Sequence, residues 1–174
     1  TDKMQLFTAE AILKMPNEGK GSNPIVADPL RLHDCSLISD GAAALVLAPT
    51  AEAKAISKKV VEIAGIGSKT ERMPENVRPN MYELTAGKLA VKQSFAEAGI
   101  TIKDVDLAEV HDCFTINQLI STEALGLSKD GRAGYDYMEG KFTRDDKCPI
   151  NLSGGLKSKG HPVGATGASM HALI

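Results

Sequence analysis

Two histidines stand where short apolar stretches end, and imidazole is the side chain best suited to proton transfer near neutral pH. His111 follows the predicted strand 107–110, and His161 lies within residues 151–167, which read NLSGGLKSKGHPVGATG. A neutral imidazole can take a proton from a nucleophile or donate a hydrogen bond to a developing oxyanion, which suits acyl chemistry. If the two preceding strands are neighbours, we expect both histidines to face one crevice.

The segment 151–167 is unusually rich in glycine, which is favoured where the backbone takes positive φ or comes very close to another group. Its glycines are Gly154, Gly155, Gly160, Gly164 and Gly167. A predicted strand before the segment and a predicted apolar helix after it would place it where ligands bind in an α/β sheet. Lys157 and Lys159 could meet a phosphate there or be solvated loop ends. Composition alone is also consistent with a glycine-rich turn that contains an incidental histidine.

The elements around these residues alternate, which predicts an α/β layered fold with helices crossing over a sheet. Residues 42–48 are a continuous apolar run of strand length, which we expect to be buried on both faces. Further strands are predicted at 60–66, 107–110 and 149–152. Helices are predicted at 8–14, with Thr8 as its cap, and at 50–57, with Thr50 as its cap. A third helix is predicted to follow the capping pair Asn80 and Glu83 and to end at Gly99. Two more are predicted at 116–125, between the cap Thr115 and Gly126, and at 165–174. A short capped turn is predicted at 101–104, and loops are predicted at 15–32 and 131–147.

The composition is that of a globular chain of one domain, with 174 residues of which 43% are hydrophobic. The formal net charge is −2, from 20 basic and 22 acidic residues. We therefore expect neither nucleic acid nor an anionic membrane as a partner. No run approaches the roughly 20 apolar residues of a membrane span. The chain starts at Thr1 and stops inside an apolar run at Ile174, which predicts a piece of a longer protein.

Three cysteines, Cys35, Cys113 and Cys148, form no CxxC pair. This odd count argues against a disulfide framework and for a reducing, cytoplasmic compartment. The remaining histidines, His33 and His171, are expected to be structural or solvent-facing. No metal site is expected, because the two candidate histidines lack a third histidine or a suitably spaced carboxylate.

Three motifs resemble those of the thiolase family, in the order and approximate spacing of that family. Residues 160–167, GHPVGATG, resemble the GHPxGxxG loop, and residues 39–44, SDGAAA, resemble the strand that closes the first half of the fold. Residues 111–114, HDCF, resemble the sterol-carrier-protein-type and archaeal acetyl-CoA acetyltransferase branch. The resemblance covers essentially all of the chain. It implies a five-layered α/β/α/β/α fold, with 1–58 as the end of the loop region and the last part of the N-terminal half, and 59–174 as a truncated C-terminal half.

The resemblance also implies an acyltransferase that acts on acyl-CoA thioesters without a covalently bound cofactor or a metal. His161 corresponds to the histidine that activates the catalytic cysteine and helps to bind the thioester oxygen. His111 corresponds to the position that completes the oxyanion site, directly or through a water. The expected partners are the acyl-CoA substrate and further copies of the chain in a dimer or tetramer, or the missing half of the fold. The residues expected to line the thioester end of coenzyme A are Ser153, Gly154, Gly155 and Gly160.

The chain departs from the family at its nucleophile. The acylated cysteine of the family lies upstream of the residues present here, and its second cysteine lies beyond Ile174. None of the three cysteines of this chain is expected to replace it, so the chain alone is expected to be catalytically silent and incompletely folded. Three functions stay open: part of an acyl-CoA thiolase, which the presence of both histidines favours, a non-catalytic thiolase-like subunit that binds CoA or another chain, and a thiolase-fold retro-aldolase acting on acyl-CoA.

Overall fold

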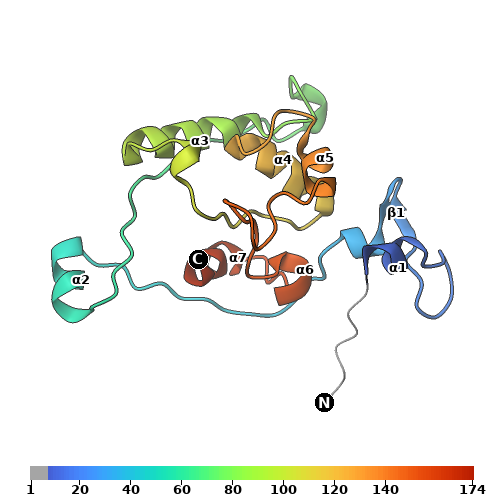
Figure 1. Cartoon of the computed structure of the whole chain (residues 1–174), viewed down its shortest axis with the longest axis horizontal. Coiled ribbons are helices and arrows are strands. Elements are labelled where there is room, and N and C mark those ends of the chain that lie inside the picture. The colour runs from blue at the N-terminus through green and yellow to red at the C-terminus, as the bar shows by residue number, and fades with distance from the viewer. Residues whose placement is uncertain (1–7) are drawn as a thin grey trace, which may run out of the picture.

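The computed structural model describes residues 8–174. Its helices and strands are α1 (Ala9–Leu13), β1 (Ile25–Ala27), β2 (Leu30–Arg31), α2 (Thr50–Ile56), α3 (Thr85–Ala98), α4 (Thr115–Leu125), α5 (Ala133–Met138), α6 (Gly155–Lys159) and α7 (Thr166–Leu173), with 3₁₀ turns at Leu32–Asp34, Glu75–Val77 and Ile102–Asp104. In Figure 1, α3, α4 and α5 form one group, and α6 and α7 form a second group below it. The α2 helix stands apart from both at the end of a long irregular connection.

These groups are joined by short backbone pairings and not by a continuous sheet. Within residues 8–174 the one named sheet is the antiparallel pair of β1 and β2, which lies inside a predicted loop. Ala108 forms an isolated parallel bridge with Ile150, in which the Ala108 N–H donates to the Pro149 carbonyl at 3.0 Å and the Asn151 N–H donates to the Ala108 carbonyl at 2.8 Å. The predicted strands at 107–110 and 149–152 are therefore reduced to one bridge, but they do lie side by side.

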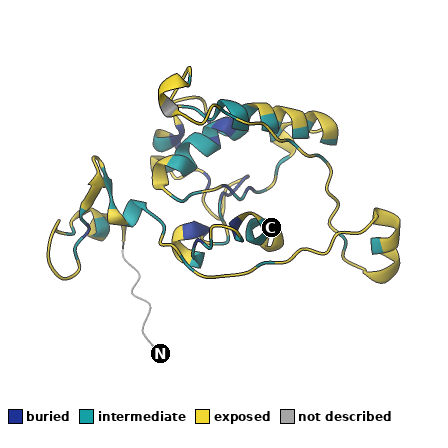
Figure 2. Cartoon of the chain, turned by 180° about the vertical axis from the view of Figure 1, so that it is seen from behind, coloured by how far each residue is buried: buried dark blue, intermediate teal, exposed yellow. Residues whose placement is uncertain are grey.

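Two other predicted strands are wrong. Residues 42–48 and 60–66 form no strand, and in the first of them Val46 is 96% exposed where burial on both faces was expected. Figure 2 shows most of this connection as exposed chain. A β ladder needs a partner strand, and none lies alongside these residues within the described part of the chain. An apolar run indicates that a segment can be buried, but it does not say what buries it.

Glycine explains how the second of these runs is held against α3. A Cβ on Gly65 would collide with the Ser94 carbonyl, and a Cβ on Gly67 would collide with the Ala90 carbonyl, so the two backbones are in direct contact. The Ile66 N–H also donates to the Glu97 carboxylate at 3.1 Å. The segment is therefore anchored through its backbone, not through strand pairing.

Most helix ends follow the sequence. The Thr8 hydroxyl accepts the Ala11 N–H at the start of α1, and Gly99 and Gly126 end α3 and α4 in the left-handed conformation. The capped turn at Ile102–Asp104 also forms as predicted.

Three predicted caps are wrong. Thr50 and Thr115 are the first residues of α2 and α4, whose caps are Pro49 and Phe114. The α3 helix begins at Thr85, after the predicted capping pair. The capping partners that the pattern expects are taken elsewhere: the Thr115 hydroxyl donates to Asp34 at 3.0 Å, and the Asn80 side chain accepts the Tyr82 N–H at 2.7 Å. The short helices α5 and α6 were not predicted, because glycines and charges obscure helical periodicity over five or six residues.

The buried apolar core lies directly behind the candidate histidines. It consists of Ala108, Val110, Phe142 and Ile150, with Leu125, Leu127 and Tyr137 packed against it. Burying each large apolar side chain contributes about 1.5–3 kcal/mol. Val110 immediately precedes His111, and Ile150 immediately precedes the glycine-rich segment. Burial of these two residues therefore fixes where both site segments begin.

Candidate active site

The rings of His111 and His161 are neighbours. Their centroids are 4.9 Å apart and their planes meet at 75°, an edge-to-face arrangement. His161 is buried, whereas His111 is exposed. The expectation that the two histidines approach one another is confirmed, although they are 50 residues apart in the chain. That they face one crevice, and their chemical roles, stay predictions.

Asn151 aligns the two segments that carry these rings. Its side-chain oxygen accepts the Val110 N–H at 2.8 Å, and its own backbone takes a φ of 56°. Positive φ is uncommon outside glycine, but asparagine tolerates it better than most residues. One residue thus ends the pairing of Ala108 with Ile150 and turns the chain into the glycine-rich segment. On the other segment, the Asn117 side chain donates to the His111 carbonyl.

Asp112 attaches the His111 segment to α6. One oxygen of its carboxylate accepts the Leu156 N–H at 2.9 Å, in the first turn of that helix. A Cβ on Gly155 would collide with the other oxygen, and Gly155 has a φ of 67°. The close backbone approach predicted for this glycine is therefore present, but the group approached is the protein's own carboxylate. An anion at this helix N-terminus would compete with Asp112.

Ser153 is held by a buried ion pair. Its N–H and its hydroxyl donate to the two oxygens of Glu109 at 3.0 and 2.6 Å. Lys159 donates to the Ser153 hydroxyl at 2.9 Å and lies 3.3 Å from the Glu109 carboxylate. The Glu109 and Lys159 side chains are only 4% and 14% exposed. The Ser153 hydroxyl is therefore committed to the protein and does not point to a free binding surface.

The two lysines of the glycine-rich segment differ in exposure and in their partners. Lys159 is paired with Glu109, and the Lys157 ammonium donates to the carbonyls of Cys35 and Leu32 at 2.9 and 3.4 Å. Of the two alternatives left open by the sequence, phosphate contact and solvation, solvation holds for exposed Lys157 and not for Lys159, whose side chain is largely buried. Both side chains tie the segment to other parts of the chain.

Residues 39–41 pack directly against His161. The His161 N–H donates to the Ser39 hydroxyl at 3.2 Å, and the Ser39 N–H donates to the His161 carbonyl at 3.4 Å. A Cβ on Gly160 would lie 2.8 Å from the Ser39 oxygen, and a Cβ on Gly41 would lie 2.8 Å from the Pro162 ring. Two motifs separated by more than a hundred residues therefore form one contact, with a glycine required on each side of it.

The electrostatics around His111 favour its neutral form. Although His111 is exposed overall, the protein covers part of its ring, and this partial burial, followed by the nearby His161 ring, lowers the pKa of His111 below its ordinary value, while the Asp112 carboxylate opposes the shift. The other ring is held from its inner side, since His161 Nδ1 lies 2.8 Å from the hydroxyl of buried Thr166. Sequence reasoning missed Thr166 and Asp112, although both lie within the GHPVGATG and HDCF motifs.

Two of the three cysteines, Cys113 and Cys148, are poor nucleophiles. Burial raises the pKa of the Cys113 thiol and also that of Cys148, so both stay protonated near neutral pH. Among residues 8–174 no group of three or more histidine, cysteine or acidic side chains is placed to hold a metal ion. In the same residues no helix has the length and apolar character needed to cross a membrane.

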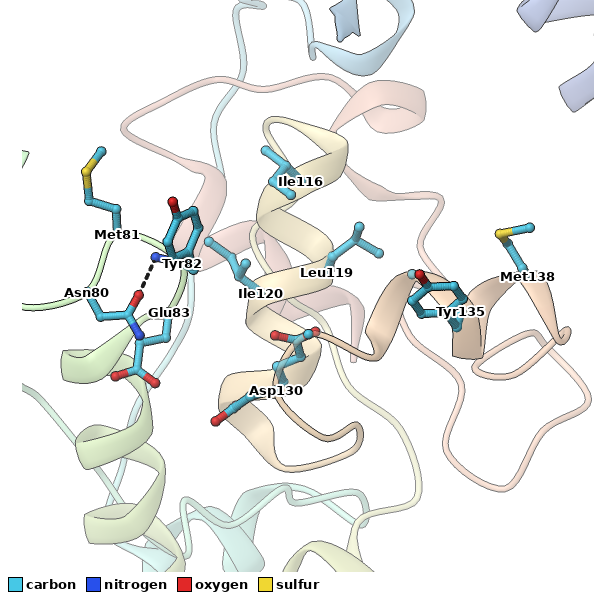
Figure 3. A pocket seen from close by; sticks show the side chains of 13 residues that line it. Asn80, Met81, Tyr82, Glu83, Ile116, Leu119, Ile120, Asp130, Tyr135 and Met138 are labelled. Atoms are coloured by element: carbon cyan, nitrogen blue, oxygen red, sulfur yellow. Dashed lines mark hydrogen bonds between the residues drawn. The ribbon is translucent and has the colours of Figure 1, made fainter. Parts of the chain in front are cut away.

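An apolar groove of about 660 Å³ lies on the other side of α4. Ile116, Leu119 and Ile120 project into it between Tyr82 and Tyr135 (Figure 3). The opposite side of α4 contacts the site, because Asn117 donates to the His111 carbonyl and Gln118 lies 3.5 Å from Asn151. The helix therefore separates this groove from the histidine pair. The apolar residues of α4 were visible in the sequence, but the groove depends on how residues 80–83 and α5 flank them.

Comparison with known proteins identifies the family of the chain. The thiolase C-terminal domain-like family matches residues 67–173, which is more than half of the chain. The chain therefore belongs to the thiolase C-terminal domain-like family. The α/β fold class expected from the sequence, an incomplete thiolase-like domain, is confirmed.

The chain spans only part of the length of individual relatives. It is 38% identical over 166 residues to the acetyl-CoA acetyltransferase of Methanothermobacter thermautotrophicus, covering 95% of this chain and 43% of that protein. It is 38% identical over 155 residues to human sterol carrier protein 2, covering 86% of this chain and 28% of that protein. The solved structure of an Ltp2-ChsH2(DUF35) aldolase superimposes with a TM-score of 0.75 at 22% identity, covering 94% of this chain and 42% of the other. The chain thus spans less than half the length of these relatives.

Proposed function

We propose that this chain is the part of an acyl-CoA thiolase that supplies its histidine base, for Claisen condensation or thiolytic cleavage through an acyl-cysteine. The observation that carries the proposal is the edge-to-face pair of His111 and His161, with centroids 4.9 Å apart. The relatives named acetyl-CoA acetyltransferase support the reaction class. The nucleophilic cysteine would come from residues outside this chain.

In the proposed reaction the His161 imidazole takes the proton of the cysteine thiol. The thiolate attacks the carbonyl carbon of the acyl-CoA thioester, and coenzyme A leaves as a thiolate that is then protonated. His111 donates a hydrogen bond toward the developing oxyanion, directly or through a water. Its lowered pKa supports this role, because a neutral ring adjoins His161 without repelling the imidazolium that forms there.

We place the thioester end of coenzyme A along the backbone of Gly154, Gly155 and Gly160. Ser153 would contact coenzyme A through its backbone, because its hydroxyl donates to Glu109. Residues 1–58 would complete the N-terminal half of the fold and 59–174 would form most of the C-terminal half. We further propose a cytoplasmic protein that forms a homo-oligomer or assembles with the remainder of the fold, without a covalently bound cofactor.

The test is thiolytic cleavage of acetoacetyl-CoA by the intact protein. Replacing the base, His161→Asn, should lower kcat/KM by about 10²–10⁴-fold, the usual contribution of a positioned general base. His171→Asn is the matched control and should retain activity, because His171 is exposed and its ring contacts only the Gly167 carbonyl of its own helix among the described hydrogen bonds. Full activity of His161→Asn would refute the proposal. Cleavage of acyl-CoA side chains without thiolysis would instead identify an aldolase, and coenzyme A binding without either reaction would identify a non-catalytic subunit.

A further inference from the structure

Thr166 lies against the inner nitrogen of His161 and has no part in the proposed reaction so far. It is the first residue of α7 and is 2% exposed. Its hydroxyl oxygen is 2.8 Å from His161 Nδ1 and 3.0 Å from the Pro162 carbonyl oxygen. A hydroxyl has one proton, so a buried hydroxyl that lies between a ring nitrogen and a carbonyl oxygen can donate to only one of them.

Counting protons distinguishes the two possible arrangements. If the hydroxyl donated to Nδ1, its oxygen would face the Pro162 oxygen at 3.0 Å with no proton between two electronegative atoms. If the hydroxyl instead donates to the Pro162 carbonyl, a lone pair on the hydroxyl oxygen can accept the hydrogen bond of a protonated Nδ1. Both short contacts are then hydrogen bonds. A threonine hydroxyl that donates to the carbonyl four residues earlier is also common in helices. The second arrangement is the favourable one.

We propose that Thr166 is a positioning residue that holds His161 in the tautomer with its proton on Nδ1 and leaves Nε2 free as the base. A ring held in this way takes a proton at Nε2 without turning, since the imidazolium keeps its Nδ1–H bond to Thr166. The use of this tautomer rests on the proposed function, but its existence does not. Buried Thr166 therefore links the start of α7 to the protonation state of the site.

The tautomer can be measured without any reaction. In the intact protein labelled with ¹⁵N-histidine, an unprotonated ring nitrogen resonates far from a protonated one, and His161→Asn identifies the signals of this ring. At a pH where the ring is neutral, we expect Nδ1 protonated and Nε2 unprotonated. Thr166→Val, which keeps the shape and removes the hydroxyl, should shift the ring toward a mixture of tautomers. Thr166→Ser, which keeps the hydroxyl, should restore the original spectrum.

Two results would overturn the inference: a protonated Nε2 in the unmodified protein, or an unchanged spectrum in Thr166→Val. If Thr166→Val does not fold, the unmodified protein and Thr166→Ser still test the inference. Protonation of Nδ1 in both proteins supports it, and protonation of Nε2 in either protein refutes it. In the thiolysis assay, Thr166→Val should lose about tenfold or more in kcat/KM, the equivalent of one hydrogen bond, and Thr166→Ser should regain it. Absence of thiolysis together with the expected tautomer would refute the proposed function and leave the positioning role standing.

Discussion

At the scale of single residues, the site depends on glycines that admit other groups of the protein. Gly155 admits the Asp112 carboxylate, and Gly160 and Gly41 admit Ser39 and Pro162. In each case the missing Cβ allows two segments distant in sequence to touch. The glycine-rich segment is therefore shaped first by its own packing, and a ligand would meet a backbone that is already held in place.

Gly155→Ala should destabilise the protein, because the new Cβ collides with the Asp112 carboxylate and φ is 67°. A left-handed conformation alone costs an alanine about 1–2 kcal/mol, and the collision adds to this. Gly164→Ala is the matched control, since a Cβ there meets nothing within 4 Å and φ is not positive. Thermal and denaturant unfolding should show a loss in the first variant and little change in the second. Equal effects in the two variants would contradict the packing described here.

The lowered pKa of His111 predicts a pH dependence of stability. The unfolded state takes up the histidine proton near its ordinary pKa of about 6.5, whereas the folded state takes it up at lower pH. The contribution of His111 to stability should therefore be complete above about pH 6.5 and decline as pH falls from there toward the folded pKa. His111→Gln should remove this part of the pH dependence.

NMR titration of the His111 ring checks the cause directly. Its midpoint should lie below that of a free histidine and rise in His161→Asn, which removes the neighbouring ring that disfavours a second positive charge. A midpoint at or above the ordinary value would show that Asp112 outweighs burial and the His161 ring.

At the scale of elements, α6 is held on both sides by acidic residues from the His111 segment. Asp112 binds the first turn of α6, and Glu109 binds Lys159 at the end of α6 and Ser153 just before it. A five-residue helix is too short to be stable alone, so these tertiary contacts determine that it forms. The same contacts fix where the chain emerges toward Gly160 and His161.

Lys159→Met should destabilise the protein by about 3–5 kcal/mol, because it leaves the Glu109 carboxylate buried without its partner. The control is Lys54→Met, which breaks an ion pair with Glu62 whose side chains are 62% and 52% exposed. An exposed pair contributes about 0–1 kcal/mol, so this variant should be nearly neutral. Chemical denaturation of both variants gives the comparison, and a neutral Lys159→Met would contradict the view that Glu109 depends on Lys159.

At the scale of the whole molecule, the described chain leaves much apolar surface in contact with solvent. The most exposed residues of the two unpaired runs are Val46 at 96%, Leu47 at 72% and Val61 at 91%. Large apolar side chains that are exposed in such number normally indicate an interaction surface or a tendency to aggregate. It contrasts with the small buried core behind the histidines.

Expressed alone, the 174-residue chain should therefore self-associate. Light scattering coupled to size exclusion should show species larger than a monomer whose proportion rises with concentration. Val46→Lys combined with Val61→Lys should reduce this association, whereas Ala51→Lys, on the exposed surface of α2, adds a charge outside the two runs and should change it little. A monodisperse monomer at high concentration would show that these runs are not adhesive.

The sequence by itself determined the chemical character of this protein: two histidines after apolar segments, glycines where backbones touch, and motif residues that identified the family. Each of these features can be recognised from the residue types and their spacing within a single segment. Only the tertiary structure decided that Asp112 occupies the start of α6, that Ser153 and Lys159 serve Glu109, and that Thr166 holds His161. It also decided that the runs at 42–48 and 60–66 stay unpaired. These hydrogen bonds and strand pairs join segments that are distant in the chain, so they depend on which groups folding brings within about 3 Å of each other. The pattern of residues along one segment does not contain that information.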